Sequence, residues 1–176
     1  MMRFYGLKPE TASGLDALRA RKERWWEIDL EYHGNRYLIN DITSAIALAQ
    51  LSQLDHFISK RKKIWDYYQH KLGHVQDLII PTEPPIYTKS SYYFYWIQLK
   101  DSQEQLSLAR ELVNNGIYTT FRYYPLHLID YYKSRAILTN SEHITQTSLN
   151  LPLHQNLSRR ECDRIVSTVK QWVKKR

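Results

Sequence analysis

Cysteine is almost absent from this sequence. Its single cysteine, Cys162, excludes a framework of disulfide bonds within the chain and is compatible with a reducing compartment such as the cytoplasm. No apolar run approaches the roughly 20 residues of a membrane-spanning helix. The N-terminus shows no signal-peptide pattern. We therefore expect a soluble, cytoplasmic protein without a membrane partner.

Glycine is also scarce, and the five glycines do not cluster into a phosphate-binding loop. The sequence contains no GxGxxG, Walker, HExxH or CxxC motif, so the commonest nucleotide-binding and metal-binding signatures are missing. His70 and His74 are spaced like two ligands on one helix, but no third ligand lies near them in the sequence. We expect surface histidines there and no metal. Cys162 has no adjacent histidine and is predicted to be a packed thiol.

Positive charge is in excess, with a net charge of +7. Such a chain could bind nucleic acid, a phosphorylated small molecule or an acidic partner. The basic residues are dispersed, however, and the clusters at 60–63 and 174–176 lie near predicted helix C-termini, where cations are favoured. The consecutive aromatic residues 92–96 would place rings on both faces of a strand, which favours burial over a base-stacking platform. Nucleic-acid binding therefore ranks last among the functions considered.

The segment 40–72 carries the clearest pattern. Apolar residues recur along it at intervals of three and four, as on the buried side of an amphipathic helix. This stripe consists of Ala47, Leu51, Leu54, Ile58, Trp65, Tyr68 and Leu72, with Arg61 as a charged exception. Asn40 or Asp41 can cap the start, and Gly73 suits the end. No glycine or proline interrupts the run, so we predict one long helix that bridges two packing environments.

The rest of the chain predicts a small α+β domain. Segments with strand composition lie at 91–99, 117–123 and 147–151. Helices are expected at 101–115, at 127–134 and after Ser158. This order predicts an α+β fold, a long helix followed by a small antiparallel or mixed sheet with helices on one side.

The last helix has the strongest local signals. Ser158 can cap it, and Glu161 completes a capping box. Ile165, Val169 and Trp172 or Val173 form its expected buried side.

Three further segments carry polar residues that packing alone does not explain. Residues 33–37 place a basic group in a turn before a helix N-terminus, where exposed N–H groups favour anions. Residues 121–127 and 149–154 each end a predicted strand at a proline turn that carries a histidine. Each segment alone is more often structural, but the three together are a more specific signal.

With these segments in order, the chain resembles the C-terminal part of the DegT/DnrJ/EryC1/StrS family of PLP-dependent sugar aminotransferases. The resemblance covers nearly the whole chain. The matching positions are 3–6, 34–46, 48–51, 54–55, 61, 67–68, 72, 116–117, 124–127, 149–154 and 157–158. It implies a fold type I aminotransferase, with this chain as its small C-terminal domain and the helix that leads into that domain.

The resemblance implies three divisions of the chain. Residues 1–39 would be the tail of the large domain and a turn, 40–72 the long linking helix, and 73–176 the small C-terminal α+β domain. The family's Schiff-base lysine belongs to a segment that would precede Met1. We therefore expect an incomplete enzyme without catalytic residues of its own, which is inactive alone and does not bind PLP alone.

Site residues also follow from the resemblance. Asn35 and Arg36 fall where many members contact the PLP phosphate of a neighbouring subunit, and a guanidinium suits phosphate oxygens. Leu38 departs from the polar residues that members often carry at its position. Arg122 and His127 are candidates for binding the substrate, a sugar nucleotide.

Several functions remain open at this stage. The complete enzyme would transfer an amino group from glutamate to a nucleotide-linked keto sugar. Alternatively, the chain is a non-catalytic subunit that complements a separately encoded large domain, or a truncated remnant that self-associates. The apolar residues Ile42, Ile46 and Ala49 need cover, so we expect a homodimer or a larger oligomer.

Overall fold

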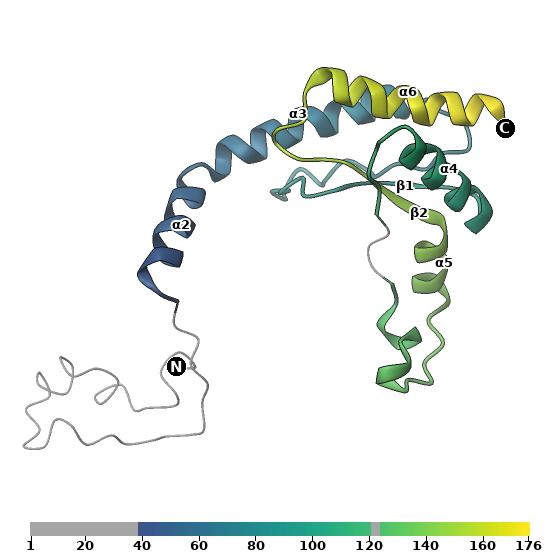
Figure 1. Ribbon diagram of the computed structural model, residues 1–176, viewed down its shortest axis with the longest axis horizontal. Coiled ribbons are helices and arrows are strands. Elements are labelled where there is room, and N and C mark those ends of the chain that lie inside the picture. The colour runs from purple at the N-terminus through teal and green to yellow at the C-terminus, as the bar shows by residue number, and fades with distance from the viewer. Residues whose placement is uncertain (1–38, 121–123) are drawn as a thin grey trace, which may run out of the picture. The chain divides into compact units, whose positions relative to one another are not determined.

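A computed structural model describes residues 39–120 and 124–176 of the chain (Figure 1). The chain divides into two compact units, Met1–Gln53 and Leu54–Arg176. The described part of the first unit is the helix α2, Asp41–Ser52. The second unit contains α3 (Leu54–Leu72), β1 (Tyr95–Gln98), α4 (Ser102–Asn114), α5 (Thr139–Thr147), β2 (Ser148–Leu151) and α6 (Arg159–Lys175). Within the described ranges, no helix is long and apolar enough to cross a membrane.

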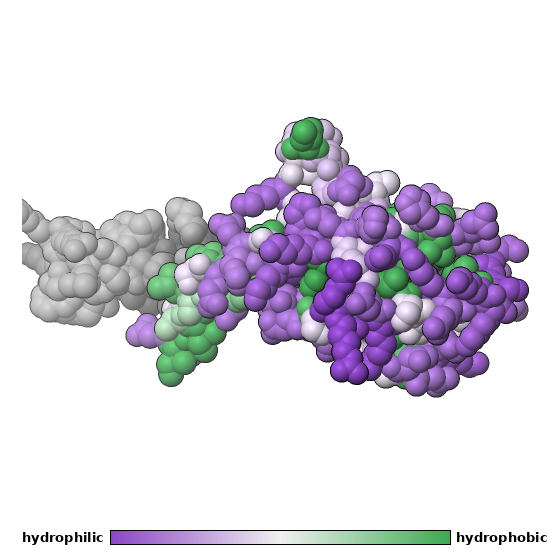
Figure 2. Space-filling view, turned by 90° about the horizontal axis from the view of Figure 1, so that it is seen from above, coloured by the Kyte–Doolittle hydropathy of each residue, from purple (hydrophilic) through white to green (hydrophobic). Residues whose placement is uncertain are grey.

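The helix α2 forms where its cap and composition predict, but it buries nothing. The Asn40 side chain caps the helix by accepting a hydrogen bond of 2.8 Å from the backbone N–H of Thr43. No residue of α2 is buried, and Ile42 and Ile46 are 76% and 60% exposed. Figure 2 shows apolar side chains gathered on this helix. Ile42 and Ile46, which were predicted to need cover, are thus exposed in this structure, and the predicted oligomer stays a prediction.

The prediction of one uninterrupted helix over 40–72 is wrong at Gln53, which separates α2 from α3. The Ala49 carbonyl, which would accept the Gln53 backbone N–H in a continuous helix, accepts instead from Ser52 Oγ at 2.9 Å and Gln53 Nε2 at 3.2 Å. The Gln53 backbone N–H donates to Gln50 O at 3.2 Å. Side-chain competition for a helical carbonyl explains the break without a glycine or proline.

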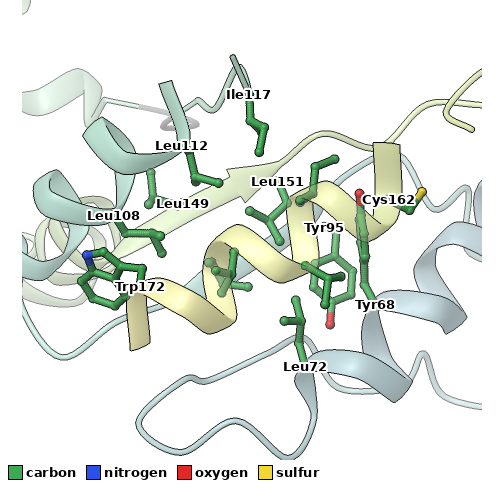
Figure 3. Close-up of a cluster of buried hydrophobic side chains, with 14 of the residues drawn as sticks. Tyr68, Leu72, Tyr95, Leu108, Leu112, Ile117, Leu149, Leu151, Cys162 and Trp172 are labelled. Carbon is green, nitrogen blue, oxygen red and sulfur yellow. The ribbon is translucent and has the colours of Figure 1, made fainter. Parts of the chain in front are cut away.

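The core of the second unit lies between the sheet and its helices (Figure 3). The strands β1 and β2 pair antiparallel, with Tyr95 opposite Leu151 and Ile97 opposite Leu149. These four side chains point to one face of the sheet and are buried. Helices α3, α4 and α6 add further residues to the same cluster, namely Trp65, Tyr68, Leu72, Leu108, Leu112, Cys162, Ile165, Val169 and Trp172. The sheet is therefore covered by helices on this face, as predicted.

The local helix signals are confirmed in α4 and α6. Asp101 caps α4 by accepting from the backbone N–H groups of Gln103 and Glu104, both at 3.0 Å. Ser158 and Glu161 form the capping box of α6. The predicted buried side of α6 is confirmed, with Trp172 rather than Val173 as its buried residue near the C-terminus. The predicted packed thiol of Cys162 is buried, and burial raises its pKa.

The strands are shorter than predicted. Regular pairing over 91–99 is confined to β1, and Tyr92 adopts a left-handed backbone with a φ of 46°, which a strand cannot accommodate. Of the strand predicted at 117–123, Thr120 makes an isolated antiparallel bridge to Asn150, and residues 121–123 lie outside the described residues. Within residues 39–120 and 124–176, the sheet has two strands.

The segment between this bridge and β2 also differs from the prediction. The short helix expected at 127–134 is replaced by two 3₁₀ turns, Leu126–Leu128 and Asp130–Tyr132. Lys133 then takes a left-handed conformation with a φ of 45° and ends the second turn. The helix α5 lacks a side-chain cap and has one buried residue, Thr147, so the sequence carries no strong signal for it.

Candidate functional site

A hollow lies on the face of the sheet opposite the hydrophobic core. Along β2, the side chains of Leu149 and Leu151 face the core, so the intervening Asn150 points to the other face. The hollow has a volume of about 350 Å³. It is lined by Tyr93, Phe94, Tyr118, Thr120, Asn150, Leu151, Pro152, Leu153 and His154. The size falls at the lower end of small-molecule pockets.

Asn150 is one of the polar residues that line this hollow. It is only 9% exposed. Its backbone N–H donates to Thr120 O at 2.9 Å, and its backbone carbonyl accepts from Thr119 Oγ1 at 2.8 Å. Within residues 39–120 and 124–176, no hydrogen bond involves its side-chain amide. The main-chain hydrogen bonds of Asn150 therefore hold its side-chain amide, with one acceptor and one donor group, in the wall of the hollow.

Aromatic rings form another wall. Tyr93, Phe94 and Tyr118 are 57%, 50% and 78% exposed, whereas the neighbouring Tyr95 is fully buried in the core. Tyr93 and Phe94 pack edge to face, with ring centroids 6.0 Å apart. The consecutive aromatic residues thus divide between the core and the hollow. Rings beside an amide can hold a planar ligand or the apolar face of a sugar.

His127 has a structural partner. Its Nε2 lies 2.8 Å from Glu142 Oε1, and the His127 side chain is 7% exposed. Glu142 Oε1 also accepts from the Leu138 backbone N–H at 3.2 Å. The hydrogen bond with His127, followed by that with Leu138, lowers the pKa of Glu142. This clasp joins the first 3₁₀ turn to α5, and a role of His127 in substrate binding stays a prediction.

The described residues include only part of the predicted site. Asn35, Arg36 and Arg122 lie outside the described residues. The segment 149–154 does lie beside the chain that leads into 121–127, because Thr120 bridges to Asn150. No group of three or more histidine, cysteine or acidic residues in the described part of the chain could hold a metal.

Asn150 and Tyr118 were missed as individual site residues. The detectable signal for Asn150 was its position between two leucines in a strand, where an amide must face away from the core. Tyr118 lies in the predicted strand 117–123, but residues 117–119 are not in a strand, so strand alternation does not place its side chain.

The second unit is a small α+β domain with a hollow on one face of its sheet. Comparisons with known proteins show the family to which the chain belongs. The profile of the DegT/DnrJ/EryC1/StrS aminotransferase family matches residues 11–170. The chain is 36% identical over 154 residues to dTDP-4-dehydro-2,3,6-trideoxy-D-glucose 4-aminotransferase of Saccharopolyspora spinosa. This protein therefore belongs to the DegT/DnrJ/EryC1/StrS aminotransferase family.

Solved structures agree with that assignment. The aminotransferase TlmJ from Streptoalloteichus hindustanus superposes with a TM-score of 0.79 at 36% identity, over 92% of this chain and 45% of TlmJ. A Streptococcus pneumoniae protein solved in its PMP form shares the fold, with a TM-score of 0.80 at 24% identity, over 99% of this chain and 43% of that protein.

The matches cover only part of each relative. The aligned region is 88% of this chain but 39% of the Saccharopolyspora enzyme. What the chain shares with its relatives is therefore less than half of their length.

The described residues do not fit the covalent part of a PLP site. A Schiff-base lysine is typically desolvated, which lowers its pKa, but every lysine within residues 39–120 and 124–176 is exposed or half-buried. Lys62 shows the opposite shift, because its hydrogen bond with Asp66 raises its pKa. This part of the chain thus supplies no amine suited to hold the cofactor.

Proposed function

We propose that this chain provides the C-terminal domain of a PLP-dependent aminotransferase that acts on nucleotide-linked keto sugars. The observation that carries the proposal is the match to a nucleotide-sugar aminotransferase at 36% identity over 88% of the chain. The hollow around Asn150 supports it, because this domain offers a polar and aromatic pocket on its uncovered sheet face. PLP would supply the chemistry of amino transfer in the complete enzyme.

The described domain would contribute binding and shape rather than covalent chemistry. Since none of its described lysines is buried, the Schiff-base lysine would come from another segment of polypeptide, in the same chain or in a different one. Asn35 and Arg36 are proposed to contact the PLP phosphate of a neighbouring subunit, and Arg122 and His127 the sugar nucleotide. On this proposal the described domain alone is inactive.

A second proposal concerns what covers α2. Its side chains Ile42, Ile46, Leu48 and Leu51 are 60–76% exposed. A helix that is apolar around most of its circumference is normally buried in a larger body. We infer that α2 packs against a large aminotransferase domain or, where the chain is alone, against another copy of itself. This is the basis for the alternatives of a complementing subunit and a self-associating remnant.

Borohydride trapping tests the first proposal. The purified chain is mixed with PLP, reduced, digested and mapped for labelled lysines. We expect weak label scattered over exposed lysines such as Lys60 and Lys63. Stoichiometric label on one lysine would show a working Schiff-base site in this chain and overturn the domain assignment.

Sedimentation of the same sample tests the second proposal. Association that strengthens with concentration is expected for the chain alone. A folded monomer at high concentration, together with no complex after co-expression with a large domain of the family, would contradict it.

A further inference from the structure

We propose that the hollow around Asn150 binds the pyrimidine base of a nucleotide, with the Asn150 amide pairing to the edge of the base. The proposal rests on the proposed function in one respect, because that function makes a nucleotide-linked sugar the substrate. It adds the subsite, the part of the ligand that enters it and the residue that recognises it.

The first argument is the state of the Asn150 amide. Asn150 is 9% exposed, and its hydrogen bonds within the described residues are all made by the main chain. Among the described residues, the fully buried side-chain atoms without a partner are Arg61 Nε and Tyr95 Oη, so the Asn150 amide keeps access to water from the hollow. A ligand that replaces this water can bond to both atoms of the amide.

The second argument is chemical complementarity. The amide of Asn150 offers one acceptor, Oδ1, and two hydrogens on Nδ2. Uracil and thymine present an N–H donor next to a carbonyl acceptor on one edge, so the pair can form two parallel hydrogen bonds. Phosphate offers acceptors only, so it could use Nδ2 but would leave Oδ1 without a partner.

The third argument is the wall of the hollow. Base stacking on aromatic side chains is a common way to hold a nucleotide, and exposed rings of Tyr93, Phe94 and Tyr118 line the space. A volume of about 350 Å³ accommodates a single ring with part of its sugar. Among the residues that the structure describes, the hollow is lined by no lysine, arginine, aspartate or glutamate, and His154 is its basic side chain. The described lining therefore suits a planar group.

The test is a titration of the ¹⁵N-labelled full chain followed by NMR, with no cofactor added. The probes are UDP, dTDP, GDP and inorganic pyrophosphate. We expect UDP and dTDP to shift the amide resonances of residues around the hollow, such as Thr120 and Leu153. Guanine offers an N–H beside a carbonyl as uracil does, but its two fused rings exceed the space for a single ring, so GDP should bind at least tenfold more weakly. Pyrophosphate should leave these resonances unchanged.

Asn150→Ala is the decisive variant, because the bonds from Asn150 to Thr119 and Thr120 are made by its backbone and remain possible. It should weaken UDP binding at least tenfold while the rest of the spectrum stays folded. Asn114→Ala, at the exposed end of α4, is the matched control and should bind like the parent chain. Tyr118→Ala, at a residue 78% exposed, tests stacking without touching the core.

Each result decides the proposal. Equal shifts by pyrophosphate, equal binding of GDP, or unchanged binding by a folded Asn150→Ala chain would overturn it, as would no binding of UDP and dTDP. If the nucleotides bind as expected but the chain combined with a large domain of the family transfers no amino group, the proposed function fails and this subsite stands.

Discussion

The helices α2 and α6 make opposite use of their apolar residues. α2 is almost free of charge, with Asp41 in its first turn, and it buries nothing. α6 carries many charged residues and yet buries Cys162, Ile165, Val166, Thr168, Val169 and Trp172. The face of the second unit seen in Figure 2 is mostly hydrophilic, whereas apolar side chains are prominent on α2.

The difference shows that apolar content does not by itself decide burial. The apolar residues of α6 recur every three or four positions, so they share one side that packs on the sheet and α3 while its charges remain in water. Those of α2 are distributed around the helix and have no partner within the described residues. α2 is thus suited to an environment that surrounds it, as the proposed larger assembly would provide.

Matched truncations give the largest expected effect. Ile165→Ala in α6 removes a side chain that is 3% exposed and should lower the free energy of unfolding by about 2–5 kcal/mol. Ile46→Ala in α2, where the side chain is 60% exposed, should change it by less than about 0.5 kcal/mol in dilute monomer. Urea denaturation of both variants measures this. Equal costs at low concentration would mean that α2 is buried within the monomer.

The helix caps provide a smaller contrast. Ser158→Ala removes the side-chain partner of the Glu161 backbone N–H and should lower the free energy of unfolding by about 1 kcal/mol. Asn40→Ala removes the equivalent bond to Thr43 but should leave the main unfolding transition unchanged, since α2 lies outside that core. A cap on α2 that stabilises the whole domain as strongly as Ser158 would show that the two units unfold together.

The smallest expected effect is a dependence on pH at the start of α6. Hydrogen bonds from the Ser158 hydroxyl and backbone N–H lower the pKa of Glu161 below its ordinary value of 4.5. Because the folded pKa is depressed, the stabilisation by the carboxylate is fully present above pH 4.5 and is lost as the pH falls through the folded value. The difference in unfolding midpoint between the parent chain and Glu161→Gln should therefore shrink between pH 6 and pH 3. A difference that is constant over this range would contradict the assignment.

Features that depend on neighbours a few residues away could be predicted from the amino-acid sequence. The caps at Asp101 and Ser158 and the buried side of α6 could be predicted, because a capping bond or a helical stripe is complete within one or two turns. The family assignment likewise followed from short segments in order, and the profile match over residues 11–170 confirmed it.

Features that depend on partners far along the chain follow from the folded structure and could not be predicted. Which rings of 92–96 enter the core is set by the pairing of β1 with β2. The clasp between His127 and Glu142 depends on the path of the chain between them. The open amide of Asn150 is likewise a result of assembly, because its isolation requires the core on one face of β2 and an uncovered face on the other. Local sequence fixes hydrogen bonds and periodicity, but only the assembled sheet determines which side of it stays open to a ligand.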